Sequence, residues 1–256
     1  MSLQVFTLTE GSYSVDVTKK FIPFDPTKDN PKDRPASLFI HVQPFLVKIN
    51  EMLVLLDTGL GYSNEQGQLH LHENIKKAGF RPEDVQLVLM SHLHFDHSGG
   101  MVHHHHGKME LSFPDATYVM QRGEWETAFS SSSSSYHTDI FEFLQVNADI
   151  QLIEGSGQLN EFISYELTGA HCPYHQVFLI DDGIDKAFFG GDVLPEPEEL
   201  LRKFIAKYDY DGRKAMELRE EFGQKAVAEH WNCLFYHSKS KTQAYIALDG
   251  DRFKIV

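Results

Sequence analysis

A short histidine-rich segment follows a continuous apolar run near the middle of the chain. The run at residues 85–92, VQLVLMSH, comes after a segment of helical character and is typical of a strand buried on both faces. The next motif, HLHFDH at 92–97, begins where that strand ends. Open α/β sheets usually bind their ligands at such strand ends. The segment therefore predicts an α/β fold with a polar site at one end of a sheet.

The spacing within HLHFDH favours metal binding. His92 and His94 are two residues apart, so on an extended segment both side chains point the same way and can hold one ion. Asp96 and His97 are adjacent, and the chain must turn to direct both inward, which suits a second ion. Imidazole and carboxylate ligands fit Zn²⁺, and also Fe, Mn or Co. We expect two divalent metal ions, with zinc favoured.

A site for two ions needs further ligands, and later strand ends offer them. His171 and His175 precede one expected strand, Asp192 follows the strand KAFFGG, and His237 follows the strand CLFY. Chemistry alone does not distinguish His171 from His175, because both carry the same imidazole. Each remains a candidate ligand at this point.

Alternating patterns predict strands followed by helices along the whole chain. FLVKINEMLVLL reads as two strands joined by a turn at Asn50-Glu51. No repeat or linker divides the chain, so we expect one domain over residues 1–256, with two sheets inside and helices outside. The expected strands are 3–9, 38–56, 85–92, 116–120, 151–153, 161–167, 176–181, 186–190, 232–236, 243–247 and 252–256, and the expected helices are 69–80, 122–129, 196–208 and 212–229.

Three segments receive no definite role. The proline-rich segment 21–35 is either a lid over a pocket or a solvated excursion, and Phe21 and Phe24 either line an acyl pocket or pack the loop down. Six consecutive serines at 130–135 indicate a flexible loop. The run of four histidines at 103–106 is expected to be a mostly solvated loop, because four consecutive imidazoles cannot all face one ion.

Composition narrows the class of partner. The formal net charge is −14, which makes nucleic acid a poor partner. No apolar run approaches the roughly 20 residues that cross a bilayer, and the N-terminus has no secretion signal. The two cysteines have no framework spacing and indicate reduced thiols. We expect a cytoplasmic protein with a small-molecule substrate, no membrane partner and an open oligomeric state, a homodimer included.

The histidine motif closely resembles the HxHxDH hallmark of the metallo-β-lactamase superfamily. Further markers of that family occur in its order over roughly residues 40 to 240: Leu56-Asp57-Thr58-Gly59, Thr168-Gly169-Ala170-His171 in place of the usual Thr-Pro-Gly-His, Gly191-Asp192, and His237. The resemblance implies a four-layer αββα sandwich, with two mixed sheets packed face to face and helices outside. It also implies a dinuclear metal-dependent hydrolase.

The resemblance also implies a role for each site residue. One ion would be held by His92, His94 and His171, and the other by Asp96, His97 and His237, with Asp192 bridging. Asp57 would orient a ligand histidine from behind, although a simple turn residue is the alternative. His175 would be a buried, hydrogen-bonded neighbour. A metal-bound hydroxide would attack an ester-type bond, with Asp96 passing a proton to the leaving group and Asp192 as the second catalytic carboxylate.

Three stretches resemble the quorum-sensing, N-acyl homoserine lactonase branch: SHLHFDHSGG, QVFLIDDG and FFGGDVL. That branch implies a lactone or related carboxylic ester. It commonly places a tyrosine three residues after the bridging aspartate, where this chain has Pro195, and Tyr208 or Tyr210 are the available substitutes. Alternatives within the superfamily are a glyoxalase II-like thioesterase, a phosphodiesterase or nuclease, and an iron-dependent oxidoreductase of the same fold.

Overall fold

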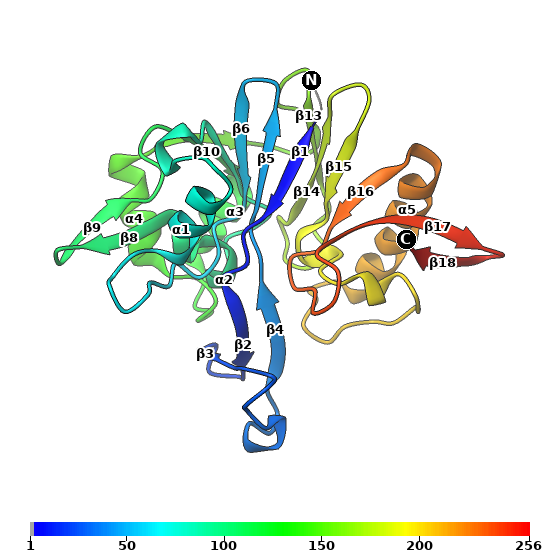
Figure 1. Ribbon diagram of the computed structural model, residues 1–256, viewed down its shortest axis with the longest axis horizontal. Helices are drawn as coiled ribbons and strands as arrows, with labels where there is room; N and C mark the ends of the chain where they lie inside the picture. Colours follow the sequence, from blue (N-terminus) through cyan, green and yellow to red (C-terminus); the bar gives the residue numbers. More distant parts are fainter. Residues whose placement is uncertain (1–2) are drawn as a thin grey trace.

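Two β-sheets packed face to face form the centre of the protein in the computed structural model, which describes residues 3–256 (Figure 1). Both sheets are mixed, because each combines parallel and antiparallel pairs. The first sheet has the order β1 (Gln4–Thr7), β5 (Phe45–Ile49), β6 (Met52–Leu56), β7 (Leu87–Leu89), β10 (Thr117–Gln121), β11 (Asp149–Ile153). The second has the order β12 (Gly157–Gln158), β13 (Ile163–Leu167), β14 (Gln176–Asp181), β15 (Lys186–Phe189), β16 (Trp231–Leu234), β17 (Gln243–Asp249), β18 (Arg252–Ile255).

Strand alternation distributes the apolar side chains between the layers. In β6, Leu55 packs on the helix side of the first sheet, whereas Val54 and Leu56 pack between the sheets. In β15, Phe188 faces outward and Phe189 joins the core between the sheets. Successive strand side chains point to opposite faces, so strands that are apolar throughout can contact a partner layer on each side.

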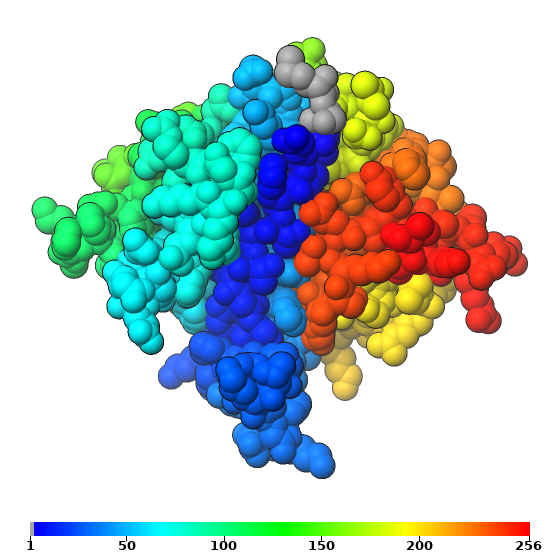
Figure 2. Space-filling model, in the orientation of Figure 1, coloured from blue at the N-terminus to red at the C-terminus, as the bar shows by residue number. Residues whose placement is uncertain are grey.

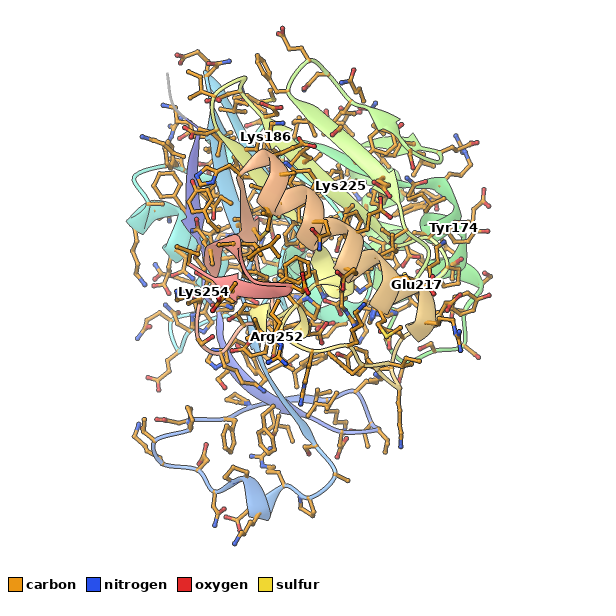
Figure 3. All side chains as sticks on the ribbon, turned by 90° about the vertical axis from the view of Figure 1, so that its right-hand side faces the viewer. Tyr174, Lys186, Glu217, Lys225, Arg252 and Lys254 are labelled. Carbon is orange, nitrogen blue, oxygen red and sulfur yellow. The ribbon has the colours of Figure 1, made fainter. Side chains whose placement is uncertain are left out.

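Helices cover the outer face of each sheet. The first sheet is covered by α1 (His70–Lys77), α3 (Arg122–Ser130) and α4 (Thr138–Asn147), and the second by α5 (Gly212–Glu229). Figure 3 views the molecule from the α5 side, with Glu217 and Lys225 marking the helix. The order of layers is helix, sheet, sheet, helix, which confirms the expected αββα sandwich.

A three-stranded arm projects from one end of the sandwich (Figures 1 and 2). It consists of β2 (Gly11–Val15), β3 (Phe21–Pro23) and β4 (Leu38–Val42), in the order β3-β2-β4. The proline-rich segment therefore begins in a strand and contains a short 3₁₀ turn at Pro31–Asp33. Phe24 is buried against Phe39, with ring centroids 4.6 Å apart, and packs the arm together.

Three expectations about local structure were wrong. His103 to His105 do not form a loop, because β8 (Val102–His105) pairs with β9 (Lys108–Leu111) in a hairpin. Only His106 lies in the turn, and His104 to His106 are exposed as expected. The helix expected at 196–208 is replaced by a 3₁₀ turn at Pro197–Glu199 and irregular chain. A helix that was not expected, α4, follows the serine run. Within residues 3–256 no helix is long and apolar enough to span a bilayer.

Candidate metal centre

The predicted site residues converge at one end of the two sheets. Asp57 follows β6 and His92 lies just beyond β7. Asp192 follows β15, and His237 lies beyond β16 in the other sheet. The short helix α2 (Phe95–Ser98) closes this end of the sandwich, next to the arm (Figure 1).

The first group consists of three histidines from two separate loops. His92 Nε2 lies 3.0 Å from His94 Nδ1, and His171 Nε2 lies 3.2 Å from the same atom. Tetrahedral zinc, with metal–nitrogen bonds of about 2.0–2.1 Å, places two ligand atoms roughly 3.3 Å apart. These three nitrogens are therefore spaced as the ligands of one ion would be.

The second group combines α2 with the loop after β16. Asp96 Oδ2 lies 3.8 Å from His97 Nε2 and 3.5 Å from His237 Nε2. The turn that directs both Asp96 and His97 inward is α2 itself, which Tyr236 anchors by donating a hydrogen bond to the Asp96 carbonyl oxygen at 2.7 Å. Asp96, His97 and His237 can hold an ion together.

Asp192 lies between the two groups and turns one oxygen toward each. Its Oδ2 lies 3.3 Å from His171 Nε2 in the first group. Its Oδ1 lies 3.1 Å from His97 Nε2 and 3.2 Å from His237 Nε2 in the second. This is the position that a bridging carboxylate needs.

Asp57 lies behind His97 and is close enough to His92 and His97 to form a third group of possible ligands with them. Its carboxylate accepts hydrogen bonds from the Ser91 amide at 2.7 Å, the Ser91 hydroxyl at 2.6 Å and His97 Nδ1 at 2.7 Å. Nδ1 of His97 therefore carries the proton and Nε2 is left for an ion. Asp57 adopts φ +54°, a conformation that is uncommon outside glycine and is found at functional sites.

His175 does not face either group. Its Nε2 accepts a hydrogen bond from the Asp192 amide at 3.1 Å, and its Nδ1 lies 2.9 Å from the Thr168 hydroxyl. Gly191, at φ +47°, leaves room for this ring, because a Cβ there would lie 2.6 Å from His175 Nε2. His175 thus holds the backbone of the Asp192 loop, as expected for a buried neighbour.

Sequence reasoning missed two contacts that hold the rings of His171 and His237. His171 Nδ1 contacts Asp209 Oδ1 at 3.1 Å, and Arg219 Nη2 holds the other oxygen of Asp209 at 3.1 Å. His237 Nδ1 donates to the His41 carbonyl oxygen at 2.6 Å. Each contact occupies the Nδ1 atom of its histidine, so the Nε2 atom faces the centre.

The electrostatics of the centre favour added positive charge. Burial opposes protonation of His97, but the carboxylates of Asp192, Asp96 and Asp57 outweigh burial and raise the pKa of His97 well above its ordinary value. Burial opposes ionisation of Asp192, but the surrounding histidines hold its pKa well below the usual range. Among the described side chains, His97 Nε2 and Asp192 Oδ1 are buried and, although 3.1 Å apart, do not meet in hydrogen-bond geometry. The residues therefore fit a pair of cations, and the His and Asp groups suggest a dinuclear metal site.

A pocket of about 330 Å³ opens onto the centre, with Asp96, His171, Asp192 and His237 in its wall. One side is apolar and comes largely from the arm: Val15, Phe21, Leu38, Phe39, Ile40 and, from α2, Phe95. The other side comes from the segment after Asp192 and includes Pro195, Glu199, Phe204 and Tyr208. Ser134 and Ser135 of the serine run, to which the sequence assigned no definite role, also line the pocket.

Two points left open by the sequence are resolved by the pocket. Phe21 lines the pocket, whereas Phe24 does not. Tyr208 and Pro195 both line it, and the Tyr208 hydroxyl lies 3.1 Å from Glu199 Oε1. Tyr210 is 71% exposed and is not part of the wall.

The amino-acid sequence is similar to those of known proteins. A family model described as the metallo-beta-lactamase superfamily matches residues 40–237. An N-acyl homoserine lactonase from Bacillus cereus is 29% identical over 157 residues, covering 54% of this chain and 57% of that protein. The N-acyl homoserine lactonase AttM from Agrobacterium fabrum is 32% identical over 150 residues, covering 54% and 48%. The chain spans about half the length of these curated relatives.

Solved structures share the fold over nearly the whole chain. A probable metal-dependent hydrolase from Staphylococcus aureus superposes with a TM-score of 0.79 at 20% identity, covering 99% of this chain and 96% of that one. AidC, described as a dizinc quorum-quenching lactonase in complex with a product, superposes with a TM-score of 0.75 at 20% identity, covering 100% and 94%. At 20% sequence identity, the similarity to these structures establishes the fold alone.

Proposed function

Because the chain belongs to the metallo-beta-lactamase superfamily, we propose that it is a metal-dependent hydrolase acting on a lactone or a related carboxylic ester. The observation that carries the proposal is Asp192, whose two oxygens face two separate ligand groups at the floor of a pocket. We propose two divalent ions, with zinc favoured by the imidazole and carboxylate donors. When bound, such ions supply Lewis acidity that activates water and polarises the acyl oxygen of a substrate.

The chain's own residues would prepare and complete the reaction. Hydrolysis adds water across the acyl carbon–oxygen bond, and the leaving alkoxide takes up one proton. Asp96 belongs to the second group and lines the pocket, so its carboxylate can take the proton that the attacking water loses and pass it to the alkoxide. The hydroxyl of Tyr208, held by Glu199 at 3.1 Å, can orient the polar end of the substrate.

The shape of the pocket supports an acyl substrate of small size. The arm supplies an apolar wall, in which Phe21 and Ile40 can hold a chain of methylene groups away from water. The relatives named as N-acyl homoserine lactonases support a lactone as the ester. The net charge of −14 argues against a polyanion such as nucleic acid, and we propose a small-molecule substrate in the cytoplasm.

A substrate panel tests the proposal. The full chain, loaded with Zn²⁺ or Mn²⁺, would be assayed with lactones of several acyl lengths, a thioester, a phosphodiester and a penicillin, each with and without chelator. We expect lactones to be turned over fastest, and chelator to abolish turnover. Thioester or phosphodiester turnover without lactone turnover would contradict the substrate class and favour the glyoxalase II-like or nuclease alternative.

Variants test whether activity depends on the metal centre and not on the histidine run at 103–106. His92→Ala and Asp192→Ala remove members of the two ligand groups, so we expect both to lose lactone turnover and to bind less metal by elemental analysis. His103→Ala is the matched control for turnover, because it removes a histidine outside the centre. Loss of activity in folded His103→Ala protein would contradict this assignment of the centre.

A further inference from the structure

The histidine run lies on a hairpin whose two faces separate its members. In the pairing of β8 with β9, His103 lies opposite Glu110. Side chains alternate along a strand, so His103 and His105 share one face with Glu110, while His104 points to the other face. The run thus contains the two-residue spacing that allows two imidazoles to bind one ion.

Contacts on this face bring two metal-binding groups together, although no three of its ligand atoms are gathered as closely as those of the metal centre. His105 Nδ1 lies 3.5 Å from Glu110 Oε2. The ring of His103 is 6.5 Å from that of His105, and its Nδ1 lies 3.3 Å from the Ser112 hydroxyl. The side chains of His105 and Glu110 are about half exposed, so rotation about their side-chain bonds can bring their ligand atoms closer.

Helix α1 adds a third imidazole. The rings of His72 and His103 are 5.2 Å apart between centroids, close to the 4.9 Å and 5.1 Å that separate histidine pairs of the metal centre. His72 Nε2 lies 2.9 Å from the Ser112 carbonyl oxygen, which can only accept a hydrogen bond. Nε2 therefore carries the proton, and the lone pair of Nδ1 is left to bind an ion.

The local charges permit a cation. Burial lowers the pKa of His72 to about 4, so its ring is neutral and able to bind metal at pH 7. Lys76 lies near His72, and Lys108 lies opposite His105 on the hairpin. These two positive charges are opposed by Glu110 at the hairpin and Glu83 near α1. We name as the hairpin cluster the residues His72, His103, His105 and Glu110.

We propose that the hairpin cluster binds one Zn²⁺ ion, at a site built from residues other than those of the metal centre. Three imidazoles and one carboxylate match the usual donors and number of ligands for zinc. Bound there, the ion would link helix α1 to the β8–β9 hairpin, two elements that β7 and α2 separate along the chain. The site stands independently of the proposed hydrolase activity.

Calorimetric titration tests the site. The full chain would first be equilibrated with buffered Zn²⁺ until the metal centre is filled, and then titrated with further Zn²⁺. We expect one additional equivalent per chain in the unmodified protein. The double variant His103→Asn/Glu110→Gln, which loses two proposed ligands, and separately His105→Asn, which loses one, should each weaken that binding by at least about tenfold. Lactone turnover should be unchanged in both.

His104→Asn is the matched control, because it removes a neighbouring imidazole from the other face of the same strand. We expect this variant to keep the additional equivalent. The proposal is overturned if the unmodified protein takes up no further Zn²⁺, or if His104→Asn and His105→Asn weaken binding equally. Equal loss would mean that exposed imidazoles bind zinc without a defined site. Circular dichroism would confirm that each variant is folded.

Discussion

At the scale of single residues, contacts behind the ligand rings determine which nitrogen faces the centre. Asp209 holds Nδ1 of His171 and is itself held by Arg219. We expect Asp209→Asn to weaken metal binding by about 10- to 100-fold, because the amide can donate to Nδ1 and favour the other tautomer. Competition with a chelator measures the affinity. Asp211→Asn is the control, since asparagine caps helix α5 equally well there; a similar loss in both variants would contradict the role of Asp209.

The sequence predicts the proposed ligands better than it predicts the residues that hold their rings in place. The seven proposed ligands follow from motif spacing and family resemblance, and the structure brings all seven together, although their binding of metal stays a prediction. Asp209 lies 38 residues from His171 and in no motif. Its position depends on hydrogen bonds that only the folded chain makes, from the Tyr210 amide to the His171 carbonyl and from the Asp211 amide to the Ala170 carbonyl.

Tyr208 gives a second prediction at this scale. It lines the same pocket as Pro195, the residue at the position of the lactonase tyrosine, and its hydroxyl donates to Glu199 Oε1. We expect Tyr208→Phe to lower kcat/KM for lactones about tenfold, the effect of losing one hydrogen bond of roughly 1.4 kcal/mol to the substrate. Steady-state kinetics on metal-loaded protein measures this change. Tyr210→Phe, which alters an exposed ring outside the pocket, should leave kcat/KM unchanged, and equal effects of the two variants would exclude a specific contact.

At the scale of elements, the arm forms the apolar side of the pocket. Phe21 and Ile22 are neighbours on β3, but only Phe21 lines the pocket. We expect Phe21→Ala to lower kcat/KM for long-chain lactones tenfold or more, because burying a side chain of this kind contributes about 1.5–3 kcal/mol. Short-chain lactones, which do not reach the wall, should be affected less. Ile22→Ala is the matched control, and an equal loss for all chain lengths in Phe21→Ala would contradict an acyl-binding wall.

Glu10, just before β2, connects the arm with the loop after β6. Its Oε2 accepts a hydrogen bond from the Leu60 amide at 2.6 Å, and burial raises its pKa to about 8. Between pH 4.5 and about 8 the folded state binds this proton more tightly than the unfolded state, so the free energy of unfolding falls as pH rises. Glu10→Gln removes the titration. Denaturant unfolding should therefore show the variant gaining stability relative to the unmodified protein across that range; parallel pH profiles would contradict it.

Helices and strands were predicted correctly where the local sequence pattern and the tertiary contacts favour the same structure. The strands that form β5 and β6 were identified because their apolar runs are separated by a turn. The segment 196–208 has a helix-like pattern, but Glu199 lies buried 2.8 Å from Arg219 of α5, and Phe204 packs under the same guanidinium group. These contacts outweigh helix propensity. The histidine run has no apolar alternation, so only its pairing with β9 reveals a strand.

At the scale of the whole molecule, the centre joins the two sheets. His92 and His97 follow strands of the first sheet, whereas Asp192 and His237 follow strands of the second. Sequence predicted the four layers, because the marker residues occur in the order of a known fold. The pocket could not be predicted in the same way, since its walls come from the arm, the serine run and the segment after Asp192, which meet only in the folded protein.

This arrangement predicts that metal stabilises the fold as a whole. Ligands from both sheets converge only in the folded chain, so ions bind the folded state in preference to the unfolded state. At a free metal concentration about 100 times Kd, each ion adds roughly 2.7 kcal/mol to the free energy of unfolding, which for a chain of this size raises Tm by about 5–10 °C. Differential scanning calorimetry with Zn²⁺ and with chelator measures the shift. His237→Ala, which removes a ligand from the second sheet, should show a smaller shift, and His104→Asn should match the unmodified protein. A Tm that is the same with metal and with chelator would mean that the two groups do not hold ions across the sheets.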